Sequence, residues 1–237
     1  MNYTVKVNEV KARDEKKSNI KGYGTVVFGD SFRIGNIAIL ERRDNGQLFV
    51  AMPGYRTREV DENGNRIIRD VCNPITAEFR EELYGNILKA YEGIHGENKG
   101  EITVGDPAVI PAFTVSVTPY DKSEGSLRGF ARVCFDECFV VSNITLVQGK
   151  EDIFVSMPNY RTEQHDENGK PVYRDICYPI TKEFREKLYG AVYNDFIEVL
   201  EAKKEQAEPN EKAKKDKPEK AEKEETEKTP TRKSKSK

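Results

Sequence analysis

The sequence predicts an α+β protein made of two tandem copies of one small domain. Residues 49–57 (FVAMPGYRT) return as residues 154–162 (FVSMPNYRT), and the agreement continues to Gly85 and Gly190. About two thirds of these positions are identical at a constant offset of about 105 residues, which indicates a duplication and is too long for a solenoid unit. In each copy, short stretches with strand periodicity precede one stretch with helical periodicity, which favours a small antiparallel sheet followed by a helix.

The chain length of 237 residues fits two domains, each able to bury only a modest core. We expect repeat one over residues 1–95, a linker over 96–107, repeat two over 108–202, and a disordered Lys/Glu-rich tail over 203–237. Each small sheet leaves apolar surface that its twin could cover. We therefore expect the repeats to pack as an intramolecular pseudo-dimer, and the chain to be monomeric.

Each repeat is expected to contain about five strands. In repeat one, alternating apolar residues predict strands around Val5 and Val7 and from Tyr23 to Phe28. The following strand changes its inside-outside parity at Asn36, and its counterpart does so at Asn143. A one-residue phase change in a period-2 pattern indicates a β-bulge.

Turn signals predict the hairpins. Asn45-Gly46 connects two strands of repeat one, and Asn63-Gly64 forms the tip of a second hairpin. Asn168-Gly169 repeats that second tip, so both copies should carry the same hairpin.

One helix should close each repeat. Thr76 and Thr181 are suitable N-caps, and Glu78 and Glu183 follow in the first turn, where the helix dipole favours acidic residues. Apolar residues then recur at helical spacing and should face the core: Phe79, Leu83, Ile87, Tyr91 and Ile94, and in the second copy Phe184, Leu188, Val192, Phe196 and Leu200. Gly85 and Gly190 lie inside these helices. Because glycine destabilises a helix, its use twice at one place predicts the close approach of another backbone.

Composition argues against several classes of protein. No run of apolar residues approaches a membrane span and the N-terminus lacks the pattern of a secretion signal, so we expect a cytoplasmic protein with no membrane partner. The four cysteines form no Cys-x-x-Cys pair, and the two histidines, His95 and His165, are not at equivalent positions. We expect reduced thiols, no metal, no cofactor and no catalytic activity.

Charge is unevenly distributed. The net charge of the chain is −2, while the tail from Glu201 carries a net +3, so the folded part must carry about −5. The basic end of the tail could contact phosphates non-specifically, or the tail could simply keep the protein soluble.

The repeated motifs resemble the SpoVG family, the stage V sporulation protein G or septation regulator. These motifs are F-V-x-M-P-x-x-R, then R-D-I-x-x-P-I before a helix, and the parity-switched strand F-V-V-x-x-I, here residues 139–144. The resemblance covers both repeats. It implies a homodimer-like arrangement and a nucleic-acid-binding regulator that contacts DNA or RNA through basic residues of the hairpin and helix.

The resemblance assigns the binding role to three arginine pairs. Arg56 and Arg161 end the M-P-x-x-R motif, Arg69 and Arg174 belong to R-D-I, and Arg80 and Arg185 open the helices. Arg58 and Arg66 add positive charge to the hairpin of repeat one, and Tyr55 and Tyr160 could stack on unpaired bases. Arg69 and Arg174 stand beside Asp70 and Asp175, so a structural ion pair is the favoured alternative for these two.

Two departures from the family pattern weaken the expected phosphate binding. Gly54-Tyr55 and Asn159-Tyr160 replace the usual Ser-Lys, and Asn73 and Tyr178 replace a histidine. The copies have also diverged in charge. Repeat one has Arg33, Arg58 and Arg66 where repeat two has Val140, Glu163 and Pro171. This pattern predicts that repeat one carries most of the affinity for nucleic acid.

The sequence thus favours a nucleic-acid-binding regulator of septation, sporulation or gene expression. The alternative is a protein-interaction module or a diverged paralogue without nucleic-acid binding, since the folded part is acidic.

Overall fold

The computed structural model describes residues 1–10, 18–94, 98–120 and 125–215. The chain divides into two units, Met1–Leu200 and Glu201–Lys237, and the first unit contains both repeats. Among the described residues, no helix is long and apolar enough to cross a lipid bilayer.

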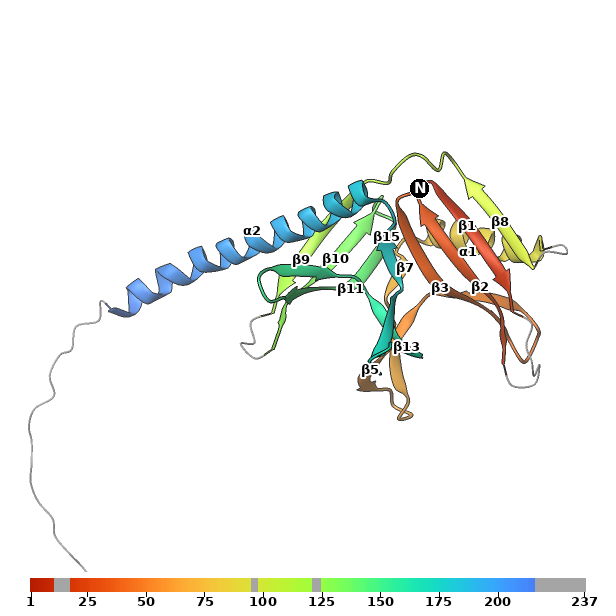
Figure 1. Ribbon diagram of the computed structural model, residues 1–237, viewed down its shortest axis with the longest axis horizontal. Coiled ribbons are helices and arrows are strands. Elements are labelled where there is room, and N and C mark those ends of the chain that lie inside the picture. The colour runs from red at the N-terminus through yellow and green to blue at the C-terminus, as the bar shows by residue number, and fades with distance from the viewer. Residues whose placement is uncertain (11–17, 95–97, 121–124, 216–237) are drawn as a thin grey trace, which may run out of the picture. The chain divides into compact units, whose positions relative to one another are not determined.

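Two antiparallel sheets organise the first unit (Figure 1). Sheet one has the strand order β15-β3-β2-β1-β8, with β4 also paired to β3. Its strands are β1 (Tyr3–Glu9), β2 (Ile20–Phe28), β3 (Phe32–Glu41), β4 (Leu48–Ala51), β8 (Lys99–Val104) and β15 (Cys177–Pro179). Sheet two has the order β12-β11-β10-β9, with β7 also paired to β11. Its strands are β7 (Cys72–Pro74), β9 (Phe113–Pro119), β10 (Leu127–Phe135), β11 (Phe139–Gln148) and β12 (Ile153–Ser156).

Each repeat adds a separate two-stranded hairpin and a helix. The hairpins are β5 (Gly54–Val60) with β6 (Arg66–Asp70), and β13 (Asn159–His165) with β14 (Pro171–Asp175). The helices are α1 (Ala77–Glu92) and α2 (Lys182–Lys215). Both begin as expected, because Thr76 and Thr181 each accept a hydrogen bond from the backbone N–H three residues later.

The two repeats exchange strands. β7 of repeat one pairs with β11 of repeat two, and β15 of repeat two pairs with β3 of repeat one. The flanking backbone bonds are also equivalent: the Ser142 N–H donates to the Val71 carbonyl and the Gly35 N–H to the Ile176 carbonyl, each at 2.8 Å. Such a reciprocal contact is what a twofold arrangement requires, so the expected pseudo-dimer packing is observed. Figure 1 shows β7 and β15 at the centre, where the two sheets meet.

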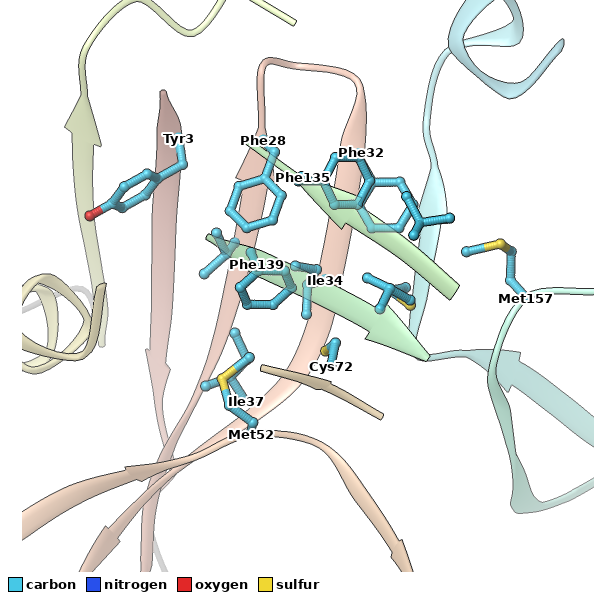
Figure 2. Close-up of a cluster of buried hydrophobic side chains, with 14 of the residues drawn as sticks. Tyr3, Phe28, Phe32, Ile34, Ile37, Met52, Cys72, Phe135, Phe139 and Met157 are labelled. Carbon is cyan, nitrogen blue, oxygen red and sulfur yellow. The ribbon is translucent and has the colours of Figure 1, made fainter. Parts of the chain in front are cut away.

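A shared aromatic core fills the contact between the repeats (Figure 2). The ring of Phe28 lies 5.0 Å from Phe139, and the equivalent pair, Phe32 and Phe135, lies 4.8 Å apart. All four rings are fully buried. Because each pair joins one repeat to the other, the largest side chains of the core belong to both domains at once.

The predicted β-bulges are present in both long strands. Asn36 and Asn143 adopt φ angles of +58° and +61°, a left-handed conformation that asparagine tolerates better than most residues. In both sheets the pairing of the neighbouring strand shifts register at this point. The parity change in the sequence therefore identified the bend correctly.

The segment expected to be a linker is partly structured. Of residues 96–107, the stretch from Lys99 to Val104 forms β8 and pairs with β1. Gly100 permits this strand to lie against α1, because a Cβ at Gly100 would collide with the carbonyl oxygen of Ala90. The connection between the repeats is therefore residues 105–112.

The tail also differs from the expectation. Residues 203–215, expected to be disordered, continue helix α2, since alanine, lysine and glutamate are all strong helix formers. The remaining tail residues, 216–237, lie outside the described residues.

The two helix glycines do not mark a close backbone contact. A Cβ built on Gly85 or Gly190 meets nothing within 4 Å, so the expected approach of another backbone is wrong at both positions.

This open space predicts that Gly85→Ala and Gly190→Ala each raise the free energy of unfolding by about 1 kcal/mol, the difference in helix propensity. Urea denaturation of the two variants and of the double variant measures the gain. Gly29→Ala is the control: Gly29 has φ +51° and its Cβ would meet the backbone of Ile110 at 2.7 Å, so this variant should lose stability. A loss of stability in the helix variants would show that the space is not open.

Candidate nucleic-acid interface

The predicted binding residues lie mainly on the two hairpins. Figure 1 shows both hairpins extending from the same side of the body, with β5 and β13 next to each other. A hollow of about 290 Å³ between their bases is lined by both Tyr55 and Tyr160, among other residues. The structure therefore brings together the two tyrosines that were candidates for base stacking.

The hairpin of repeat one carries three exposed arginines. Arg56 and Arg58 lie on β5, and Arg66 begins β6. Within the described part of the chain, none of the three guanidinium groups makes a hydrogen bond or ion pair, although Arg56 and Arg66 take part in the backbone pairing of the hairpin. They form a basic surface on β5 and β6 that is separate from the pockets on sheet one.

Arg69 and Arg174 occupy equivalent positions but have different partners. The Arg69 guanidinium forms an ion pair with Glu59 at 2.8 Å, whereas Arg174 donates a hydrogen bond to the neutral amide oxygen of Gln164 at 3.1 Å. The expected structural ion pair of Arg69 thus exists, although with Glu59 across the hairpin and not with Asp70. An exposed pair of this kind contributes little to stability, but a phosphate would have to displace its carboxylate. Arg174 has no carboxylate partner among the residues that the structure describes.

Arg80 and Arg185 tie the helices to the exchanged strands. Arg80 donates to the carbonyl of Pro74 at 3.1 Å, and Arg185 donates to the carbonyl of Pro179 at 3.3 Å. Each guanidinium also acts on the aspartate that ends the hairpin. Partial burial raises the pKa of the Asp175 carboxyl above its usual value, and the charge of Arg185 offsets part of this rise. Asp70 and Arg80 show the same balance.

The structure also forms a pocket between the repeats. We call it the composite pocket: it has a volume of about 520 Å³ and is lined by the outer face of β2 and β3 from repeat one and by β14, β15, α2 and the start of β13 from repeat two. Three of the predicted site residues, Tyr160, Arg174 and Arg185, are among its lining residues. It also contains Asp175 and three residues that the site prediction missed, namely Tyr23, Arg33 and Tyr178.

Arg33 and Tyr178 meet because of the strand exchange. They face each other in the pairing of β3 with β15, and the Arg33 guanidinium donates to the Tyr178 hydroxyl at 3.0 Å. The same guanidinium lies 5.9 Å from the centre of the Tyr178 ring, within cation–π range. The sequence did carry a signal for each residue, since Arg33 marks a charge difference between the repeats and Tyr178 marks a departure from the family pattern. It carried no signal that the two residues meet.

Arg161 lies apart from the composite pocket. With Tyr160 and Arg174 it lines a shallower hollow of about 370 Å³ on β13 and β14. Tyr160 and Arg174 belong to both hollows, so the basic surface continues from the pocket onto the hairpin.

A second pocket adjoins the composite pocket on the face of sheet one. It has a volume of about 680 Å³ and shares Asn8, Thr25, Arg33 and Tyr178 with its neighbour. Lys6, Lys99 and Glu101 also line it, and Lys6 and Glu101 lie 3.6 Å apart as an exposed ion pair. The shared residues make the two pockets one continuous groove.

The cysteine thiols and the possible metal ligands are the other groups of chemical interest among the described residues. All four cysteines are free thiols, and Cys72 and Cys177 are buried. Within the described ranges, no group of three or more His, Cys, Asp or Glu side chains is arranged to hold a metal ion.

Comparison with known proteins identifies the family. The sequence model of the SpoVG family matches residues 2–93 and 111–198. A SpoVG septation protein of Phytoplasma australiense is 35% identical over 89 residues, which are 36% of this chain and 86% of that protein. The corresponding protein of Borrelia hermsii is 36% identical over 78 residues, or 32% and 75% of the two chains. That of Heliobacterium modesticaldum is 38% identical over 77 residues, or 32% and 80%. The chain therefore belongs to the SpoVG family and contains two copies of the family's domain.

Proposed function

We propose that this SpoVG-family chain is a cytoplasmic regulator that binds DNA or RNA, and through this binding influences septation, sporulation or gene expression. Its role is to bind and not to catalyse. The composite pocket is the observation that supports the proposal most strongly, because three guanidinium groups and three tyrosine rings line it. Guanidinium groups suit phosphate oxygens, and aromatic rings stack on bases.

The arginines outside the pocket extend the proposed contact surface. Arg56, Arg58 and Arg66 would add phosphate contacts on the hairpin of repeat one, and Arg161 on that of repeat two. Arg69 would contribute less, since it is paired with Glu59, and Arg80, which like Arg185 donates to a proline carbonyl, lies outside the composite pocket.

Titration of fluorescently labelled single-stranded and duplex DNA at 50 and 200 mM KCl tests the proposal. Three phosphate contacts on a single strand give a slope of log K against log salt of about −2, so affinity should fall roughly 15- to 20-fold between the two conditions. Binding with no dependence on salt would contradict a phosphate-driven contact.

The second candidate function is protein interaction without nucleic-acid binding. The hairpin of repeat one exposes Val60, Ile67 and Ile68, the last with 65% of its surface accessible. The folded part of the chain is also acidic. An absence of DNA or RNA binding at 50 mM KCl would favour this function.

Asp175 provides a pH test of the site. Its carboxylate lies in the composite pocket and should repel phosphate, so Asp175→Asn is expected to strengthen binding of oligo(dT) several-fold at pH 7. The pKa of Asp175 is raised, so the wild-type carboxyl takes up its proton at a higher pH than an ordinary aspartate as the solution is acidified. The advantage of the variant should therefore shrink between pH 7 and pH 4.

The neighbours of Asp175 do not obscure this test. Burial raises the pKa values of Cys177 and Tyr189, so both stay neutral throughout this range, and arginine side chains stay charged. Thymine and the phosphodiester do not change protonation between pH 4 and pH 7. A variant advantage that is the same at both pH values would show that Asp175 does not act through its charge.

A further inference from the structure

We propose that the chain has one binding pocket for single-stranded nucleic acid and not two, and that the composite pocket is this site. The inference rests on the proposed function and goes further, because it states which face binds, how many strands bind and what form of nucleic acid is preferred. The duplication would suggest two equivalent sites. The side chains on the two faces do not support that equivalence.

Sheet two offers the equivalent face, and its lining differs at the positions that matter. Arg33 and Tyr178 correspond to Val140 and Asn73, which also face each other across exchanged strands. The Arg33 guanidinium and the Tyr178 ring that it covers are therefore both absent from the second face. A charge and a stacking surface are lost together.

The hairpin arginine on the face of sheet two is also less available to a phosphate. Arg69, the counterpart of Arg174, is held by Glu59, whereas Arg174 is held by the neutral Gln164. Sheet two does gain Arg132 at the position of Thr25, on the strand equivalent to β2. A single arginine on β10, where Cys134 and not Arg132 is paired with Val140, does not restore the combination of cation and ring.

The groove on sheet one has room for more than one nucleotide. The composite pocket and the adjoining pocket are each within the range of 300–1,000 Å³ that is typical of small-ligand sites, at about 520 and 680 Å³. Arg33 and Tyr178 line both, so they stand at the centre of the groove. Lys99 extends positive charge along it, whereas Lys6 is in an ion pair with Glu101, and only sheet one has the strand β8 that supplies Lys99 among the described residues.

The aromatic lining favours unpaired bases. Tyr23 and Tyr160 expose 43% and 38% of their surface, so their rings are accessible. Bases inside a duplex are already stacked on their neighbours, and only an unpaired base can place its face on a tyrosine ring. Because the Arg33 guanidinium is already held against the Tyr178 ring, binding needs little further ordering of these two side chains.

Exchanging residues between the repeats tests the inference with side chains that the other repeat already carries at the equivalent positions. Arg33→Val with Tyr178→Asn gives sheet one the pair that sheet two already carries, so the fold has accommodated these residues at equivalent positions. The matched control is Arg132→Thr, which also removes one positive charge from an outer sheet face. The probe is fluorescein-labelled oligo(dT) of about 10 nucleotides, measured by fluorescence anisotropy at 50 mM KCl. Circular dichroism melting of each variant verifies folding.

We expect the wild type to bind oligo(dT) with one strand per chain. The double variant should bind at least about tenfold more weakly, since stacking on one ring alone is worth about that much. Arg132→Thr should change the affinity less than about twofold, as a surface charge away from the contact does.

Other results would overturn the inference in distinguishable ways. Two strands per wild-type chain, or equal losses in the double variant and in Arg132→Thr, would show two working faces while leaving the proposed function intact. Duplex DNA that binds as tightly as oligo(dT) and suffers the same loss would contradict the preference for single strands. Displacement of oligo(dT) by an equal concentration of poly-glutamate would make an acidic protein segment the occupant. No binding of any nucleic acid at 50 mM KCl would remove both the proposed function and this inference.

Discussion

Phe135→Ala is expected to lower the free energy of unfolding by about 3–5 kcal/mol, the usual range for removing a buried phenylalanine. The Phe135 side chain is fully buried and its ring lies 4.8 Å from Phe32 and 5.9 Å from Phe28, both in the other repeat. It also lies 6.5 Å from Phe184 at the start of α2. A cavity at Phe135 therefore removes contacts from both repeats and from a helix.

The shape of the unfolding curve is part of the same expectation. Because Phe135 contacts both repeats, the variant should still unfold in one transition, shifted to lower guanidinium concentration. Phe154→Ala is the matched control, since Phe154 exposes 51% of its surface and should lose far less stability. A Phe135→Ala curve with two separate transitions would show that the repeats fold independently and that the aromatic core does not couple them.

Local features of the fold could be predicted from the sequence because each depends on nearby residues. Thr76 and Thr181 cap their helices through a backbone N–H three residues away. The bulges at Asn36 and Asn143 follow from a change of phase in an alternating pattern. In each of these cases, a few consecutive residues determine the local structure.

The strand exchange could not be predicted in this way. β7 and β15 have three residues each and end at Pro74 and Pro179, so neither shows a measurable period. Each finds its partner in the other repeat, and residues far apart in the sequence decide that pairing. The missed strand β8 is different, because its alternation was visible, but its glycine and charges were taken as signs of a linker.

The same limit explains what was missed in the candidate site. The hairpin arginines could be named from motifs, yet Arg33 was assigned to the basic surface of repeat one as a whole. The structure places it on sheet one, opposite Tyr178 of repeat two and in one pocket with Arg174. Strand exchange builds each face from both repeats, so a division of the charges by repeat does not describe which charges share a face.

The chain is expected to remain one particle after its backbone is cut between the repeats. The connection of residues 105–112 can be given a protease site, and cleavage should leave two fragments that co-elute at the mass of the intact monomer, 27.0 kDa. The reason is that the cut leaves the strand pairs β7–β11 and β15–β3 and the shared aromatic core intact. Contacts of this extent resemble a domain core divided between two chains, which is typical of obligate dimers.

Separating the fragments is expected to have a much larger effect than cutting the chain. Repeat one alone would expose Phe28 and Phe32, and would leave the edge of β3 without β15 and β7 without β11. A fragment of residues 1–110 should therefore either unfold or pair with a second copy of itself, since the pseudo-twofold contact can be remade between identical domains. Sedimentation velocity of the intact, cut and separated forms distinguishes these states. A stable monomeric fragment would show that the exchanged strands are dispensable, and an intact chain sedimenting as a dimer would show that the pairing occurs between chains and not within one.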